Sequence, residues 1–234
     1  YLFNSLADIR PTIVICGNHD TNLNNNNRLD ALTPVVEAHK HPNLFYLRDS
    51  GVHKIGNVTI NVMSLLDDPS KYQTADNLIG KSDCLIAMYH GTIANSKVDS
   101  GLNIAHGLDW DIFAGHDIVL LGDIHKRQTL SESDPLMFYP GSTIQQNFGE
   151  SFEGHGYAIV DVPTRTVEHF DIPNDYGHYT FEIRNGIVPD NMPITSKTSV
   201  RAKVYETTPA QLKKALAEIR KKYRNGEVVV TNMD

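Results

Sequence analysis

Three short segments place a histidine directly after an apolar run, and in two of them amide or carboxylate side chains stand beside it. They are CGNHD at residues 16–20, IAMYHGT at residues 86–92 and VLLGDIHKRQ at residues 119–128. Their candidate functional residues are Asn18, His19, Asp20, His90, Asp123 and His125. One histidine in such a position is usually structural, but three such segments in one chain predict a shared site.

The residue types in these segments indicate metal chemistry. Neutral imidazole, amide oxygen and carboxylate are ligands of cations such as Mn²⁺, Fe²⁺ or Zn²⁺. The set of thiolates that a structural zinc site would use is missing. Two divalent ions about 3.5–4 Å apart can share a hydroxide nucleophile and hold both the attacking and leaving oxygens of a phosphoryl centre. We therefore predict a two-metal site, although its bridging carboxylate is not evident elsewhere in the sequence.

The elements that must position these residues alternate between strands and helices. Apolar runs at residues 12–16, 84–89 and 118–121 are continuous, as expected for strands buried on both faces. The other predicted elements are strands at 58–64 and 156–162, a hairpin at 153–172, and helices at 1–10, 28–37 and 70–79. Sites in open α/β sheets form outside the carboxyl ends of strands, where the three segments lie. His116, in contrast, falls at the entrance of a strand and is not expected to be a ligand.

The pattern changes after residue 174, and we predict a domain boundary there. The first domain spans residues 1–174 and the second spans residues 175–234. In the second domain, SVRAKVYE at 199–206 and EVVV at 227–230 are predicted strands. Thr208, Pro209 and Gln211 between them are typical of a helix that begins with a capping box. The basic side chains of this helix are interpreted as a solvated face.

Charge and composition bear on location and partners. The formal net charge of -7 at pH 7 argues weakly against a protein coated in nucleic acid. The argument is weak because carboxylates that bind cations also count as negative charge. Cys16 and Cys84 lie in apolar runs, which favours buried free thiols and an intracellular protein. No run approaches the ~20 apolar residues of a membrane span.

The order of the three segments resembles the calcineurin-like metallophosphoesterase superfamily. The resemblance rests on GNHD, on a strand that ends in His-Gly, and on the Gly-Asp-x-His turn at residues 122–125. More narrowly, LGDIHKRQ followed by MFYPGSTIQQNFGE at residues 137–150 is similar to the SbcD-type nucleases of DNA double-strand-break repair. The similarity covers essentially the whole chain. It implies an α/β fold, a metallophosphoesterase-type αββα sandwich followed by a small β-α-β capping domain.

The resemblance also implies that the chain is a fragment. Two earlier superfamily motifs, Asp-x-His and Gly-Asp, would precede Tyr1, and the capping domain would be incomplete at its carboxyl end. The sequence also begins without methionine, in what reads as the back half of an amphipathic helix. We therefore expect the 234 residues alone to bind Mn²⁺ weakly at best and to hydrolyse nothing.

Carried over residue by residue, the resemblance assigns a role to each candidate. It makes Asn18 and His90 ligands of one metal and His125 a ligand of the other. Asp123 stands where the superfamily most often has histidine, and we keep it as a ligand of the second metal. His19 would lie over the scissile phosphate as a catalytic residue, and Asp20 would fix its tautomer and orientation. The implied cofactors are two divalent ions, with Mn²⁺ the expected metal.

The same resemblance predicts contacts with DNA. Lys126 and Arg127 follow His125 and could meet the DNA backbone, although simple salt bridges are an equal alternative. Ser142, with Tyr139, Pro140 and Gly141, is expected to shape the DNA groove. The amides predicted to donate to phosphates are those of Gln145, Gln146 and Asn147.

The implied function is a two-metal DNA nuclease with exonuclease and endonuclease activity. It would work as a homodimer with DNA and with an SMC-like coiled-coil ATPase, without a membrane. A second hypothesis keeps the site but makes the protein a phosphatase or phosphodiesterase for nucleotides, phosphoproteins or small molecules. A third is a non-enzymatic scaffold in which Asp123 has weakened one metal site.

Overall fold

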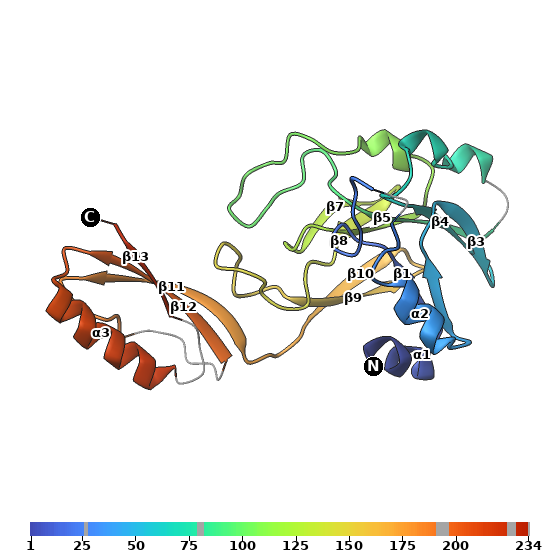
Figure 1. Cartoon of the computed structure of the whole chain (residues 1–234). Helices are drawn as coiled ribbons and strands as arrows, with labels where there is room; N and C mark the ends of the chain where they lie inside the picture. Colours follow the sequence, from blue (N-terminus) through green and yellow to red (C-terminus); the bar gives the residue numbers. More distant parts are fainter. Residues whose placement is uncertain (26–27, 79–81, 191–196, 224–227, 234) are drawn as a thin grey trace. The chain divides into compact units, whose positions relative to one another are not determined.

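The structure is a computed structural model that describes residues 1–25, 28–78, 82–190, 197–223 and 228–233. The chain forms two compact units (Figure 1). The first unit comprises Tyr1–Gly141 and Ala158–His169, and the second comprises Ser142–Tyr157 and Phe170–Asp234. The predicted domain boundary at residue 174 stays a prediction, because these units follow spatial contacts and not evolutionary domains.

The first unit is built on a six-stranded sheet with the order β3-β4-β5-β6-β8-β7. The strands in chain order are β3 (Gly51–Ile55), β4 (Val58–Met63), β5 (Cys84–His90), β6 (Ile118–Gly122), β7 (Gln128–Glu132) and β8 (Leu136–Tyr139). The four central strands are parallel, and β3 and β7 pair antiparallel at the edges. The continuous apolar runs at 84–89 and 118–121 thus form central strands, as predicted.

Both faces of this sheet carry an apolar cluster. On one face, Phe138 and its neighbours on β5 and β6 pack against Val160 and Val167 of β9 (Gly156–Asp161) and β10 (Thr166–Asp171). These two strands form a separate two-stranded sheet at the predicted hairpin. On the other face, Met63 and Val119 pack with Phe113, which belongs to the short 3-10 helix η3 (Trp110–Phe113).

The helix predicted at residues 70–79 is wrong as a single α-helix. The described part of this segment contains two 3-10 turns, η1 (Pro69–Lys71) and η2 (Ala75–Asn77), and Ile79 lies outside the described residues. Tyr72 between them is extended and buries its ring, with its hydroxyl donating to the Ser64 carbonyl at 2.9 Å. Tertiary burial of this ring interrupts the helical pattern.

The amino-terminal part of the first unit contains the helix α1 (Leu2–Ile9), as predicted, and a small parallel sheet of β1 (Thr12–Ile15) and β2 (Leu44–Leu47). The helix α2 (Thr33–His39) lies between these strands in the chain. It begins five residues later than predicted. The reason is Asp30, whose carboxylate accepts hydrogen bonds from the backbone of Leu32 and Thr33 and holds a turn before the helix.

The second unit contains a parallel sheet of β11 (Tyr176–Arg184), β12 (Lys197–Tyr205) and β13 (Val228–Asn232). The helix α3 (Pro209–Lys222) packs on one face of this sheet (Figure 1). The predicted capping box is confirmed, because Thr208 and Gln211 exchange side-chain and backbone hydrogen bonds at its start. The strand β11 was not predicted from the sequence. It begins directly after the predicted domain boundary, and in it Gly177, Tyr179 and Phe181 alternate with polar residues.

The chain is therefore a mixed α/β protein with a central mixed sheet, which confirms the α/β class alone and is compatible with a metallophosphoesterase fold. The four-layer sandwich, the truncations and the capping role of the second unit stay predictions. Cys16 and Cys84 are buried free thiols, as predicted. Among the described helices, none has the length and apolar character needed to cross a bilayer.

Candidate metal centre

Three strand ends bring the central candidates together in the first unit. His90 is the last residue of β5 and lies opposite Gly122, the last residue of β6. Asp123 follows directly, and Asn18 comes three residues after the end of β1. The parallel strands β5 and β6 deliver their carboxyl ends to one edge of the six-stranded sheet, which brings His90 beside Asp123. The turn that carries Asn18 follows β1 of the separate two-stranded sheet and meets this edge through side-chain contacts.

The side chains of Asn18, His90 and Asp123 are in direct contact. The Asn18 amide donates from Nδ2 to Asp123 Oδ1 at 2.9 Å, and its Oδ1 lies 3.2 Å from His90 Nε2. The same His90 nitrogen is 3.8 Å from Asp123 Oδ1. An imidazole nitrogen, an amide oxygen and a carboxylate oxygen thus converge, and each is a donor atom of a type that divalent cations use.

The nearby charged and titratable candidates affect the pKa of His90. Burial lowers the pKa of His90, and Asp123 and Asp20 oppose this effect, whereas His19 and His125 reinforce it. The imidazole is therefore held in its neutral form, which is the form that binds a metal. These electrostatic interactions also place all six candidate side chains in one neighbourhood.

Two glycines leave the space that the His90 ring occupies. A Cβ atom at Gly122 would lie 2.7 Å from His90 Nδ1, and one at Gly17 would lie 3.0 Å from His90 Cε1. A real Cβ atom essentially never comes as close as 2.7 Å to another atom, and a contact of 3.0 Å is already unusually tight. The glycines of CGNHD and LGDIH are thus required for the approach of the strand ends to the ring, a role that the sequence analysis did not assign.

Asp123 adopts a backbone conformation that is rare outside glycine, with φ of 97°. Such conformations cost about 1–3 kcal/mol and persist where the surroundings hold them. Two groups hold the carboxylate: Asn18 on Oδ1, and the hydroxyl of Thr92, which donates to Oδ2 at 3.1 Å. Sequence reasoning missed Thr92, although it stands two residues after His90 in the same motif.

A buried tyrosine supports the loop that follows β5. Tyr139 is fully buried, donates its hydroxyl hydrogen to the Gly91 carbonyl at 2.8 Å, and accepts from the Ile93 amide at 3.0 Å. It fixes the backbone on either side of Thr92. The ring is not accessible to a ligand, and the expectation that Tyr139 helps to shape a DNA groove stays a prediction.

The structure gives Asp20 a different partner from the predicted one. Its carboxylate accepts a hydrogen bond from the Gly17 amide at 2.9 Å, so it closes the turn that presents Asn18. Within the described residues, no hydrogen bond joins Asp20 to His19, whose side chain is exposed. The catalytic role of His19 stays a prediction.

The predicted second-metal and DNA residues follow β6. His125 is half-buried. Its backbone carbonyl lies so close to Gly141, which has a positive φ, that a side chain at residue 141 would not fit. Lys126 and Arg127 are also half-buried. Their predicted contacts with DNA stay predictions.

Ser142 and Gln145 belong to the second unit and have structural contacts. The Ser142 hydroxyl lies 2.7 Å from the Ile144 carbonyl and 2.8 Å from His155 Nδ1. The Gln145 amide is buried, donating to the His178 and Glu150 carbonyls and accepting from the His178 amide. Gln145 is thus unavailable for phosphates, which corrects that expectation, and the DNA role of Ser142 stays a prediction.

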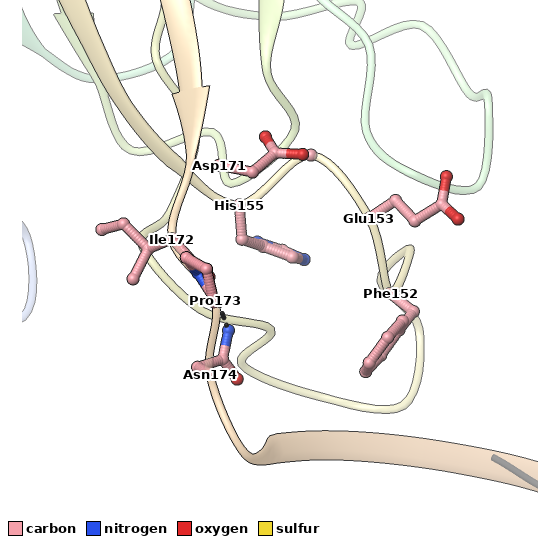
Figure 2. Close-up of a pocket in the computed structure, with 8 residues that line it drawn as sticks. Phe152, Glu153, His155, Asp171, Ile172, Pro173 and Asn174 are labelled. Atoms are coloured by element: carbon pink, nitrogen blue, oxygen red, sulfur yellow. Dashed lines mark hydrogen bonds between the residues drawn. The ribbon is translucent and has the colours of Figure 1, made fainter. Parts of the chain in front are cut away.

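A pocket of about 250 Å³ lies in the second unit (Figure 2). It is lined by Phe152, Glu153, Gly154, His155, Asp171, Ile172, Pro173 and Asn174. The His155 ring holds the surrounding loop, because its Nε2 contacts the Ser151 carbonyl at 2.8 Å and its Nδ1 contacts Ser142. None of the predicted site residues lines this pocket.

The side chains that converge at the strand ends have donor atoms of the types that divalent cations bind. In the described part of the chain, no group of three or more His, Cys, Asp or Glu side chains could hold a metal ion. The group that converges here contains only one histidine and one carboxylate, and its other potential donor is the amide oxygen of Asn18. His116 is structural, as expected: its Nδ1 donates to the Phe113 carbonyl and its Nε2 accepts from Asn61, both at 3.0 Å.

Comparison with known proteins gives three relatives, and no family model matches the chain. Over 237 residues the chain is 36% identical to the uncharacterized protein R555 of Acanthamoeba polyphaga mimivirus, with 97% of the chain and 17% of R555 covered. It is 29% identical over 163 residues to 244L of Invertebrate iridescent virus 6, which is named as a phosphoesterase; 67% of the chain and 54% of 244L are covered.

A bacterial relative covers a shorter part of the chain. The uncharacterized metallophosphoesterase YhaO of Bacillus subtilis is 35% identical over 85 residues, which are 36% of the chain and 20% of YhaO. The chain thus spans about half or less of each of these relatives. The relatives named phosphoesterase and metallophosphoesterase support the calcineurin-like metallophosphoesterase superfamily, without distinguishing its nuclease branch.

Proposed function

We propose that the protein is a metal-dependent phosphoesterase, and within that class a DNA nuclease of double-strand-break repair. The observation that carries the first step is the convergence of Asn18 Oδ1, His90 Nε2 and an Asp123 carboxylate oxygen at the strand ends. The relatives named phosphoesterase and metallophosphoesterase support the same class. The step to a nuclease rests on the resemblance of residues 121–128 and 137–150 to SbcD-type enzymes.

Asn18 and His90 would hold one divalent cation, and Asp123 and His125 would hold a second, with Mn²⁺ the expected metal. When bound, the cations would act as Lewis acids and would lower the pKa of water, which would allow hydrolysis at neutral pH. The protein contributes positioning: Thr92 orients the Asp123 carboxylate, and Asp20 holds the turn that carries Asn18. His19 would stabilise charge at the phosphate or protonate the leaving oxygen.

The proposal is tested by hydrolysis assays on the complete natural gene product with Mn²⁺. The substrates are plasmid and hairpin DNA on one side and a chromogenic phosphate monoester on the other. We expect cleavage of DNA that EDTA abolishes, and a loss of at least about 100-fold for His90→Ala, since even outer-shell partners of a metal contribute about 10–100-fold. His106→Ala is the matched control, because His106 is exposed and lies outside the site.

The other outcomes separate the rival functions. Hydrolysis of the monoester without DNA cleavage would support a phosphatase or phosphodiesterase and contradict the nuclease. Failure of metal-loaded protein to hydrolyse either substrate would favour a scaffold. We further propose homodimerisation and a coiled-coil SMC-like ATPase as partner, both from the same resemblance. Light scattering on the purified protein tests the dimer, and a monomeric mass would contradict it.

A further inference from the structure

The parallel sheet of the second unit has one face covered and one face open. Tyr179, Phe181 and Ile183 of β11 point into the apolar cluster with α3, as do Val200, Ala202 and Val204 of β12. The alternate residues project from the opposite face, and in Figure 1 no helix lies on that side of the drawn sheet. We call this the open face; its residues are Tyr176, His178, Thr180, Glu182, Arg184, Lys197, Ser199, Arg201, Lys203 and Tyr205, with Val229 and Thr231 of β13.

Aromatic rings occur at both ends of the open face, and each is paired with a cation. The Arg184 guanidinium lies 4.1 Å from the centre of the Tyr205 ring, and Lys197 Nζ lies 5.0 Å from that of Tyr176. The Tyr176 residue is 49% exposed. These rings add nothing to the apolar cluster of the unit, which lies on the other face of the sheet.

A third ring reaches the open face from the loop before β9. Phe148 packs edge-on against His178 at 4.9 Å between ring centres, and the Arg201 guanidinium lies 4.4 Å from the Phe148 ring centre. The Gln145 side chain anchors this loop to the backbone of His178. The ring is therefore held in place beside the two strands.

The open face is positively charged on a protein whose net charge is -7. It carries the cations Arg184, Lys197, Arg201 and Lys203, against the single carboxylate of Glu182. Glu182 pairs with Arg184 at 3.0 Å. Arg201 and Lys203 lie in the middle of the sheet on β12, between the strands β11 and β13. The local charge is thus complementary to a polyanion.

We propose that the open face binds single-stranded DNA. Unpaired bases can stack on Tyr176, Tyr205 and Phe148, and Arg201 and Lys203 can pair with the phosphates between them. Each cation that now lies over a ring would turn to a phosphate when a base takes its place. A duplex offers phosphates but keeps its bases stacked inside, so it cannot use the rings. The choice of DNA over RNA rests on the proposed nuclease function. The binding of a single strand by stacking and by charge does not depend on that function.

The test is fluorescence anisotropy with labelled oligo(dT) and the whole chain in EDTA. Because EDTA removes divalent metal, binding is measured apart from hydrolysis, and a failure here leaves the nuclease assay unaffected. We expect Tyr176→Leu to weaken binding about 5- to 150-fold, the range for one base-stacking ring. Tyr176→Phe keeps the ring and should bind like the natural protein.

Charge is tested with the double variant Arg201→Gln and Lys203→Gln. It should weaken binding and reduce the slope of log K against log salt by about 1.4, or about 0.7 for each lost phosphate contact. The matched control is Lys213→Gln with Lys214→Gln, two exposed cations of α3, which lies on the covered face. This control should change binding less than twofold, and circular dichroism checks that each variant is folded.

Four results would overturn the proposal. They are an absence of oligo(dT) binding by the natural protein, equal weakening by the α3 control, tighter binding of blunt duplex than of oligo(dT), and tighter binding of oligo(rU). The last would overturn the choice of DNA and assign the face to RNA.

Discussion

At the scale of single residues, the site depends on side chains that hold other side chains. Asp123 has a strained backbone and two donors on its carboxylate, Asn18 and Thr92. An outlier of this kind in a cluster of potential ligands points to a functional constraint, because strain without benefit is readily removed by mutation. Thr92 is therefore a positioning residue for Asp123.

Thr92→Val tests this role by removing the hydroxyl and keeping the shape. We expect affinity for Mn²⁺ in isothermal titration calorimetry of the complete gene product to fall about 10- to 100-fold, as is typical when a hydrogen bond to a ligand is lost. Thr92→Ser keeps the hydroxyl and should restore the affinity. Equal affinities for the valine variant and the natural protein would show that Thr92 does not support a metal ligand.

At the same scale, Gly122 determines whether the His90 ring can take its place. Gly122→Ala puts a methyl group 2.7 Å from His90 Nδ1, so the ring or the strand must move. We expect a loss of about 1–3 kcal/mol in the free energy of unfolding, the usual cost of overpacking, with weaker metal binding. Gly51→Ala is the control, since its Cβ would meet His53 at 3.4 Å, an ordinary contact. Equal stability of both variants, measured by urea unfolding, would contradict this account.

At the scale of elements, Asp30 joins the start of α2 to the end of β2. Its buried carboxylate accepts from the Thr33 amide and hydroxyl at 2.7 and 2.8 Å, and from Arg48 Nε at 2.8 Å. Burial raises the pKa of Asp30, but these hydrogen bonds outweigh burial and hold the pKa well below its usual range. The folded state thus favours the ionised carboxylate.

Asp30→Asn should lower the free energy of unfolding by about 3 kcal/mol at neutral pH, because it removes the buried charge partner of the half-buried Arg48 guanidinium, which keeps only the exposed Asp49. The folded pKa of Asp30 is lowered, so its stabilisation is complete above the unfolded pKa of about 3.9 and is lost as pH falls further. Urea unfolding at pH 7 and in the acid range should therefore show a difference that shrinks below about pH 4. Asp49→Asn, at an exposed partner of Arg48, should cost less than about 1 kcal/mol. A difference that stays constant with pH would contradict the assignment.

At the scale of the whole molecule, the two units have separate apolar cores. Ile219 of α3 is fully buried against β11 and β12, and Ile118 of β6 is fully buried in the central sheet of the first unit. Ile219→Ala should cost about 2–5 kcal/mol, the range for such truncations. Hydrogen exchange should then increase in β11, β12 and α3 and stay unchanged in β4, β5 and β6. A uniform increase over both units would indicate one cooperative fold.

Much of the fold followed from local patterns. Continuous apolar runs predicted β5 and β6 as buried strands, and cap residues predicted the start of α3, because these signals depend on neighbours a few residues apart. The run at residues 12–16 forms the strand β1, but this strand is only half-buried and pairs with β2 in a separate sheet, so the expectation that it is buried on both faces was wrong. The helix predicted at residues 70–79 failed since burial of the Tyr72 ring overrides the local period. The strand β11 was missed because its regularity becomes meaningful only beside β12.

For the site, the sequence alone determined which types of donor side chain are present and that they follow the ends of strands. Both can be predicted from a few neighbouring residues, because side-chain chemistry belongs to the residue and strand periodicity to its immediate neighbours. Only the tertiary structure decided that Asn18, His90 and Asp123 meet, that Thr92 holds Asp123, and that Tyr139 and Gln145 are buried. The physical reason is that strand register in the six-stranded sheet makes the ends of β5 and β6 coincide, whereas the turn after β1, which belongs to another sheet, reaches them only through tertiary contacts. That register is fixed by packing between residues far apart in the chain.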